Sequence, residues 1–345
     1  MRRRTFLAGT AAGGLVAAGA APAFALDRRR VLHVRPGDSV QAAVDAVDGD
    51  GWTIVVHPGT YREVVNVPAD KGELTLRGGG HDPRDVVIVF DNANGTQKPD
   101  GSGTYGTAGS ATFTSAAPGL TVRDLTLAND WLRADHPEIT GTQAVAAYVT
   151  GDRSRFSRVR LLAHQDTLFV DTSALDAFDR QYFTHCYIEG DVDFVFGRAT
   201  AVFTDCHFHT LQRDVAFTPK GMVFAPSTAR ANPYGILAVR SRITSGAEDA
   251  AYKLARPWVP SYETTAWPSL VVRDTRIGPG IDPVAPYTNM RDAYPWQSMR
   301  FHEYRNTGPG SVITVPENRP QLTAAEAALH TPATYLGGWE PVRSL

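Results

Sequence analysis

The stretch Phe183–Ile188 has the sequence FTHCYI, and Phe203–Phe208, with the sequence FTDCHF, repeats its pattern. The same pattern occurs in four more places: Val122–Leu127 (VRDLTL), Phe156–Leu161 (FSRVRL), Ala238–Ile243 (AVRSRI) and Val272–Ile277 (VRDTRI). Each copy alternates apolar with polar residues and ends on a large aliphatic or aromatic residue, which is typical of strands buried on one face. One recurring strand-like phrase indicates an internal repeat.

The copies are spaced as the coils of a solenoid would be. Their last residues are separated by 34, 27, 20, 35 and 34 positions, and 31 glycines and 23 prolines punctuate the chain. Units of this length cannot bury their apolar faces alone, so they must stack on one another. The sequence therefore predicts an all-β chain folded as a parallel β-helix. A β-sandwich is the alternative, but it does not explain why one phrase recurs.

Composition narrows the class of protein. The chain has 345 residues, of which 43% are hydrophobic and 20% charged, which excludes a disordered protein. Lys and Arg number 34 against 36 Asp and Glu, so the basic surplus of a nucleic-acid-binding protein is missing. Beyond residue 25 no apolar run is long enough to span a membrane. We therefore expect a globular protein with no nucleic-acid partner and no membrane-spanning segment.

The first 25 residues read as an export signal. Three arginines at 2–4 precede Thr5-Phe6-Leu7, a small apolar stretch follows, and Ala23-Phe24-Ala25 matches a cleavage site. The paired arginines indicate a twin-arginine signal, and an ordinary secretory signal is the alternative. We expect a signal peptide at 1–25, a single β-helix domain at 26–345, and a secreted protein.

The register of the repeat pairs two carboxyl groups. Asp166 lies five residues after Leu161, and Asp193 lies five residues after Ile188, so both occupy the same phase of adjacent coils. Stacked strands lie about 4.8 Å apart, and two carboxylates that close rarely ionise together. One pKa should rise while a cation keeps the other group anionic, which suits acid/base and nucleophilic catalysis. The alternative is that both aspartates only accept hydrogen bonds from turn backbones.

The two cysteines follow the same register. Cys186 and Cys206 each stand two positions before the end of their phrase, which predicts Cα atoms about 5 Å apart, within disulfide range. A disulfide and a pair of buried free thiols both remain open. No Cys and His set has the spacing of a zinc site.

Five phrases, in their order and spacing, resemble the pectin methylesterase (pectinesterase) family over roughly residues 31–315. They are GTYRE at Gly59–Glu63, QAVA at Gln143–Ala146 followed by GDR at Gly151–Arg153, QDTL at Gln165–Leu168, GDVDFVFG at Gly190–Gly197 and ARPW at Ala255–Trp258. The resemblance implies a right-handed parallel β-helix that removes methyl groups from the galacturonate units of pectin, that is, of methylated homogalacturonan. It also implies that neither a cofactor nor a metal is needed.

The resemblance assigns catalytic roles to five residues. Asp193 corresponds to the nucleophile, Asp166 to the general acid/base, Gln143 and Gln165 to the oxyanion donors, and Arg256 to the cation that fixes the nucleophile. The implied reaction is attack on the ester carbonyl, release of methanol with a proton from the acid, and hydrolysis of an acyl-enzyme by water.

Three aromatic residues are candidates for substrate binding. The resemblance implies that Trp258 is a platform for the sugar. Phe169 and Phe194 either line the sugar subsites or stack in the core of the β-helix.

Asp191 stands where the family commonly has a neutral residue, and it either faces solvent or perturbs the catalytic pair.

Arg198 and Arg213 are alternatives to Arg256 as the supporting cation.

Residues 91–110 are rich in Gly, Ser, Thr and Asn, which predicts a surface loop that edges the cleft. Thr323, with Glu326 three positions later, predicts the N-cap of a short C-terminal helix that packs against the β-helix or caps its end.

Other functions fit the same architecture. A polygalacturonan lyase or hydrolase is one, although a lyase would need a calcium-binding carboxylate cluster and a base. A catalytically silent carbohydrate-binding β-helix is another, and a different small acyl ester is a third. We expect pectin as the substrate and a monomer in solution.

Overall fold

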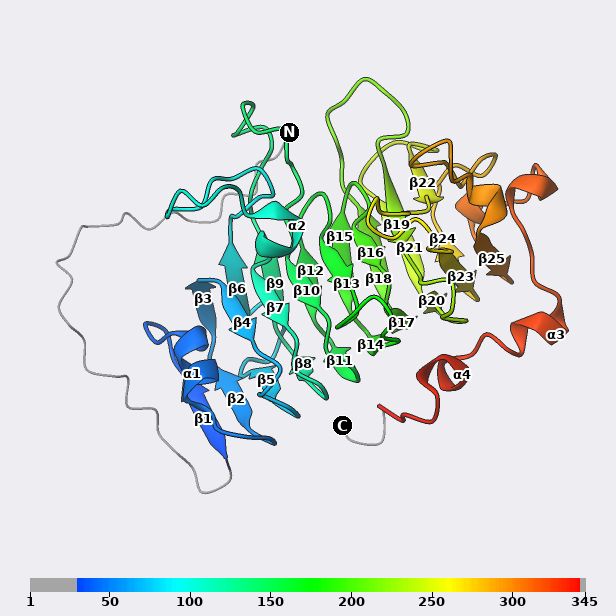
Figure 1. Ribbon diagram of the computed structural model, residues 1–345. Helices are drawn as coiled ribbons and strands as arrows, with labels where there is room; N and C mark the ends of the chain where they lie inside the picture. Colours follow the sequence, from blue (N-terminus) through cyan, green and yellow to red (C-terminus); the bar gives the residue numbers. More distant parts are fainter. Residues whose placement is uncertain (1–29, 342–345) are drawn as a thin grey trace.

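The computed structural model describes residues 30–341, and the chain in this range winds through three parallel sheets that form a β-helix (Figure 1). Ten strands form one wall: β1 (Val31–Val34), β2 (Thr53–Val56), β5 (Thr75–Gly78), β8 (Thr121–Arg123), β11 (Ser154–Ser157), β14 (Arg180–Thr184), β17 (Thr200–Thr204), β20 (Ile236–Val239), β23 (Ser269–Arg273) and β25 (Arg300–Tyr304). The predicted signal peptide at 1–25 lies outside the described residues.

Two further walls complete each coil. The eight-stranded sheet contains β3 (Gly59–Arg62), β6 (Val86–Phe90), β9 (Thr126–Asn129), β12 (Arg160–Leu162), β15 (Tyr187–Gly190), β18 (His207–Thr210), β21 (Arg242–Ser245) and β24 (Arg276–Ile277). The seven-stranded sheet contains β4 (Val65–Val67), β7 (Phe113–Ser115), β10 (Ala147–Val149), β13 (Leu168–Val170), β16 (Val195–Gly197), β19 (Gly221–Pro226) and β22 (Tyr252–Ala255). The predicted fold class is confirmed.

The repeat marks the stacking register. The last residues of the six phrases pair in one column of the eight-stranded sheet, with Leu161 opposite Ile188 and Ile188 opposite Phe208. On the ten-stranded wall the rings of Phe156, Phe183 and Phe203 stack at centroid distances of 4.8 and 4.7 Å. These fully buried rings belong to one continuous core inside the coil. Stacking of equivalent apolar residues is therefore what fixes the position of each coil on the next.

Both ends of the chain add helices. The N-terminal helix α1 (Val40–Ala46) buries Val40, Ala43 and Val44 in the core. Near the C-terminus, α3 (Ala324–Ala327) has the predicted capping box of Thr323 and Glu326. Short 3-10 helices η1 (Trp296–Ser298), η2 (Pro309–Ser311) and η3 (Pro316–Asn318) lie between β25 and α3 or just before β25.

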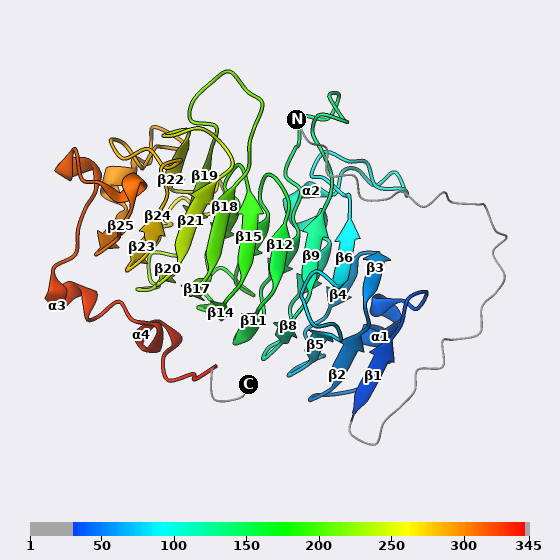
Figure 2. The ribbon, with the colours of Figure 1, turned by 180° about the vertical axis from the view of Figure 1, so that it is seen from behind.

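The C-terminal segment runs back along the ten-stranded wall (Figures 1 and 2). A second helix, α4 (Pro332–Leu336), contacts β14 and β17, so the segment packs against a face and does not cap the end. Its side chains Tyr335 and Leu336 join a cluster with Tyr182 and Val202 on the outer side of the wall. The prediction of one helix was incomplete.

Long connections project from one edge of the β-helix. The connection after β6 carries the short helix α2 (Gly106–Gly109), and the connections at 130–146 and 211–220 rise from the same edge (Figures 1 and 2). All three lead from the eight-stranded sheet into the seven-stranded sheet, so they border the same groove. Within the described residues, no helix is long and apolar enough to cross a membrane.

Candidate active site

Asp166 and Asp193 occupy equivalent corners of adjacent coils. Each stands two residues before a strand of the seven-stranded sheet, and the paired residues Leu168 and Val195 fix them at the same height. Both corners are left-handed, with φ of 65° at Asp166 and 49° at Asp193. Aspartate tolerates this conformation better than most residues with a Cβ atom. The register predicted that the two aspartates lie side by side in adjacent coils, and both line one cavity.

Arg256 reaches Asp193 from two strands away. It follows β22 directly, and β22 pairs with β19, which in turn pairs with β16. Its Nε donates to Asp193 Oδ1 at 2.9 Å and its Nη2 donates to Oδ2 at 2.6 Å. A two-point contact between a guanidinium and a carboxylate fixes orientation as well as charge. Neither alternative cation takes this place, because Arg198 pairs with Asp171 and Arg213 donates to the carbonyl oxygen of Lys220.

Burial and charge separate the two carboxyl groups. Burial raises the pKa of Asp166 well above its usual range, the charge of Asp193 raises it further, and Arg256 opposes the rise. Burial also raises the pKa of Asp193, but the charge and hydrogen bonds of Arg256 oppose that rise directly. The direct contact with Arg256 therefore favours the ionised form of Asp193, whereas burial and the nearby charge of Asp193 favour a proton on Asp166.

Two glutamines face the same space. Thr142 Oγ1 donates to Gln165 Oε1 at 2.7 Å, which leaves the NH₂ group of Gln165 as the donor toward the cavity. Gln143 lies in the adjacent coil, where the backbone N–H of Ala144 donates to the carbonyl oxygen of Gln165 at 3.1 Å. Gln143 also lines the cavity. Amide donors at the cavity wall are suited to stabilise negative charge on an ester oxygen.

The third acidic residue does not face solvent. Asp191 is 1% exposed and accepts hydrogen bonds from Arg133 Nη1 at 2.7 Å and Nη2 at 3.1 Å, with His164 Nδ1 at 3.5 Å. Burial would raise the pKa of Asp191, but His164 and Arg133 hold it below its usual value. Its negative charge contributes to the raised pKa values of both Asp166 and Asp193. Of the two alternatives, perturbation of the pair is correct.

A cavity of about 410 Å³ opens above the pair. Besides Asp166, Asp193, Gln143, Gln165 and Arg256 it is lined by Thr107, Ala108, Phe169, Phe196, Ala225, Trp258, Tyr262 and Met290. Phe169 stacks on Phe196 at 4.2 Å, and Trp258 meets both rings at 5.8 and 5.6 Å. The loop at 91–110 edges the cavity through α2, as expected.

Phe194 is not part of the cavity lining. It is fully buried and packs in the core, although its neighbour Val195 also points inward. The left-handed corner at Asp193 interrupts the strand alternation, so two consecutive side chains face the interior. The assignment of Phe194 to a sugar subsite is therefore wrong, whereas Phe169 and Trp258 do reach the cavity. Tyr262 and Met290 were missed, because neither lies in a strand or in a quoted phrase.

A second hollow of about 460 Å³ adjoins the cavity and shares Gln165 and Arg256 with it. Arg213 and Lys220 also line it, so this side of the groove is basic. Among residues 30–341, no group of three or more His, Cys, Asp or Glu side chains is arranged to hold a metal ion.

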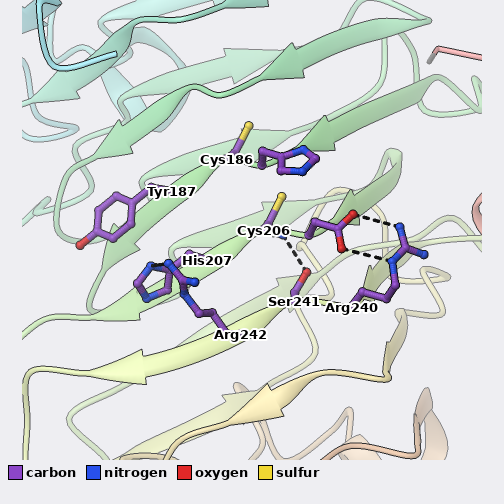
Figure 3. Close-up of a pocket in the computed structure, with 9 residues that line it drawn as sticks. Cys186, Tyr187, Cys206, His207, Arg240, Ser241 and Arg242 are labelled. Atoms are coloured by element: carbon purple, nitrogen blue, oxygen red, sulfur yellow. Dashed lines mark hydrogen bonds and ion pairs between the residues drawn. The ribbon is translucent and has the colours of Figure 1, made fainter. Parts of the chain in front are cut away.

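A third hollow, of about 420 Å³, lies at the corner between the ten-stranded and eight-stranded sheets (Figure 3). Of its two arginines, Arg240 and Arg242, the first donates to Asp205 through hydrogen bonds of 3.2 and 3.0 Å. Cys186 and Cys206 lie beneath it, stacked in adjacent coils as predicted, and both are buried free thiols. It contains no carboxyl pair and no amide donor, so the chemistry belongs to the cavity at Asp166 and Asp193.

Comparison with known proteins identifies the family of this chain. The profile of the pectinesterase family matches residues 37–338. A pectinesterase from Ralstonia solanacearum is 34% identical over 307 residues, covering 79% of this chain and 76% of the relative. The pectin methylesterase structure from Erwinia chrysanthemi has 30% identity and a TM-score of 0.79, covering 92% of this chain and 99% of that one.

A second solved structure is a pectin methylesterase in complex with a hexasaccharide. It also has 30% identity, with a TM-score of 0.78, and the match covers 88% of this chain and 94% of that one. Family profile, relatives and folds all extend over most of the chain, and the residues that the profile matches include the coils that carry the two aspartates. The chain belongs to the pectinesterase family of carboxylic ester hydrolases.

Proposed function

We propose that this chain hydrolyses the methyl esters of galacturonate units in pectin, releasing methanol and pectate through an aspartyl acyl-enzyme. The observation that carries the proposal is the asymmetry of the carboxyl pair. Asp166 and Asp193 occupy equivalent buried corners, but the guanidinium of Arg256 contacts Asp193 alone. One group is thus prepared as an acid and the other as an anion.

In the first half of the reaction, an oxygen of Asp193 attacks the ester carbonyl carbon. Negative charge moves to the carbonyl oxygen, where the amides of Gln143 and Gln165 donate hydrogen bonds. The bond between carbon and the methoxy oxygen then breaks, and Asp166 gives its proton to that oxygen. Methanol leaves, and a mixed anhydride joins the galacturonate to Asp193.

In the second half, Asp166 is a carboxylate and acts as a base. It takes a proton from water as the water oxygen attacks the galacturonate carbonyl carbon of the anhydride. The bond to the oxygen of Asp193 breaks, which restores the Asp193 carboxylate and the protonated Asp166. Because each group ends as it began, the pair is ready for the next ester.

The ester specificity is tested by methanol release from highly methylated pectin, with a chelator present and UV absorbance followed in the same sample. We expect methanol without a rise in absorbance. A rise would indicate lyase cleavage, which produces an unsaturated sugar, and absence of methanol would contradict the proposed substrate. The complex of a family neighbour with a hexasaccharide supports a carbohydrate polymer as the ligand.

The acyl-enzyme is tested by measuring how it divides between two nucleophiles, hydroxylamine and water. Pectin carrying methyl esters and pectin carrying ethyl esters are each hydrolysed in the presence of hydroxylamine, and hydroxamate is measured against free acid. Both esters form the same anhydride, because the methanol or ethanol has already left. The ratio of hydroxamate to free acid should therefore be the same for both esters. Ratios that depend on the alcohol would contradict a shared covalent intermediate.

We also propose that residues 1–25 direct export, that the mature enzyme acts outside the cell, and that it is a monomer. The twin arginines and the Ala23-Phe24-Ala25 site support export. N-terminal sequencing of the protein from the culture medium should begin close to residue 26. Light scattering of the mature protein should give the mass of one chain.

A further inference from the structure

A second polar row crosses the seven-stranded sheet at the end opposite to the catalytic aspartates. Asp171, Arg198 and Ser227 each follow the last residue of a strand, β13, β16 and β19 respectively. The pairing of Phe169 with Phe196 and of Gly197 with Pro226 places the three in register. We call this set, with the neighbouring Tyr148 and Tyr262, the Arg198 cluster.

The row is buried and incompletely hydrogen-bonded. Arg198 is 2% exposed and its Nε lies 3.2 Å from Asp171 Oδ1. Within the described part of the chain, Arg198 Nη1 and Nη2 and Ser227 Oγ have no hydrogen-bond partner. Burying guanidinium N–H donors without an acceptor costs folding free energy, so native proteins rarely keep such donors unless they have a function. The two unpaired nitrogens of Arg198 therefore indicate that a ligand supplies the acceptor.

An aromatic side chain lies both over Arg198 and along the catalytic cavity. The ring of Tyr262 lies over Arg198, with its centroid 5.7 Å from the guanidinium carbon. Tyr262 lines the cavity and is 60% exposed, and its hydroxyl interacts with Arg198. Tyr148 stacks on Phe169, another cavity residue, at 4.6 Å. Rotation of Tyr262 alone would open Arg198 to a ligand that lies in the cavity.

The arrangement of the two unpaired nitrogens of Arg198 indicates which ligand could bind. Asp171 takes the Nε side of Arg198, while Nη1 and Nη2 remain as a planar pair of donors that matches a carboxylate. The Ser227 hydroxyl can donate to the same anion. Burial raises the pKa of Asp171 to about 6, so its negative charge is easily lost to a proton when a second carboxylate arrives.

We propose that Arg198 binds the free carboxylate of a uronic acid unit further along the same polymer, after Tyr262 rotates aside. The inference rests on the proposed function. Arg198 lies five residues after Asp193, a separation of roughly 10–16 Å at about 3.3 Å per strand residue, so a different sugar from the one under attack would reach it. The enzyme then prefers chains that already carry free acid groups, which are its own product.

The test compares two substrates, fully methylated pectin and pectin with half of its esters removed at random. For the wild-type enzyme we expect kcat/KM per ester to be about tenfold higher on the half-esterified polymer, the order of one hydrogen bond to a charged group. In Arg198→Lys, which keeps the ion pair with Asp171 but loses the paired donors, that ratio should fall toward one. Asp171→Asn with Arg198→Gln should abolish it.

Arg240→Lys is the matched control, since Arg240 also pairs with an aspartate but lies at the far corner (Figure 3). It should keep the wild-type ratio. A wild-type ratio near one, or an unchanged ratio in folded Arg198→Lys, would overturn the inference. Absence of methanol from both polymers with the wild-type enzyme would instead refute the proposed function.

Discussion

Asp191→Asn and Asp193→Asn are near-isosteric changes two residues apart in one buried turn, and we expect them to have opposite effects. Asp193→Asn should abolish turnover, because the proposed nucleophile is lost. Its thermal stability should be unchanged or higher, because burial disfavours the ionised Asp193 carboxylate more than Arg256 favours it. Asp191→Asn should keep most of the turnover, because Asp191 points at Arg133 and not into the cavity.

The stability loss in Asp191→Asn follows from the Arg133 pair. Removing one partner of a buried ion pair costs about 3–5 kcal/mol. Arg133 keeps 24% of its side chain exposed, so water recovers part of this, and we expect about 1–3 kcal/mol. At about 2 °C per kcal/mol for a chain of this size, Tm should fall by about 2–6 °C.

The pH dependence has a definite sign for each variant. The folded pKa of Asp191 is lowered, so its contribution exists above the ordinary value of 3.8 and is lost as pH falls through the folded pKa. The folded pKa of Asp193 is raised, so any gain in Asp193→Asn appears at higher pH and vanishes below 3.8.

Calorimetry at neutral and acid pH, with methanol release from pectin as the activity assay, distinguishes these outcomes. An active Asp193→Asn would refute the mechanism. An inactive but folded Asp191→Asn would mean that the roles of the two aspartates are exchanged. Equal losses of Tm in both variants would refute the electrostatic reasoning.

Three further predictions concern the same site. In Asp191→Asn both limbs of the pH profile of kcat/KM should move to lower pH, since the charge of Asp191 raises the pKa of Asp166 and of Asp193; movement to higher pH would contradict this. Gln165→Ala should lower kcat by about 10²–10³, the usual cost of an oxyanion donor, with little change in Tm; stopped assays on pectin measure it, and a loss confined to KM would remove the donor role. Gly197→Ala should lower Tm without any change in the reaction. The added Cβ would stand 1.9 Å from the Val170 carbonyl oxygen, and the φ of 127° at this position disfavours a residue with a side chain. An unchanged melting curve would show that the backbone at this corner can shift to make room.

The repeat phrase was enough to predict the fold and the carboxyl pair. Equivalent positions in stacked coils are neighbours, so counting five residues from Leu161 and from Ile188 located Asp166 and Asp193 without any structure. Arg256 could not be found by counting, because it lies 63 residues from Asp193 and reaches it across two strands. The family phrase ARPW supplied it.

Contacts made by the connections could not be predicted from the register. Arg133 reaches Asp191 from the connection before β10, 58 residues away, and loop conformation is not encoded in strand alternation. The assignment of Phe194 to a sugar subsite was wrong for a related reason, because the corner at Asp193 breaks the alternation of inward and outward side chains. The helix α4 did have a readable signal, namely Thr331 as N-cap, Pro332 in the first turn and the left-handed Gly337 at the end.

The returning C-terminal segment changes how the molecule should come apart. In a linear stack each coil is held only by its neighbours, so a free end can peel away one coil at a time. Here α4 follows β25 in the chain but rests on β14 and β17, and Arg180 of β14 donates to the Leu336 carbonyl oxygen at 3.1 Å. The coil that includes β14 also carries Asp193 on another of its walls. A cut or detachment near residue 330 therefore removes a contact from the coil that carries Asp193, and we expect catalytic activity to report fraying at the far end of the chain.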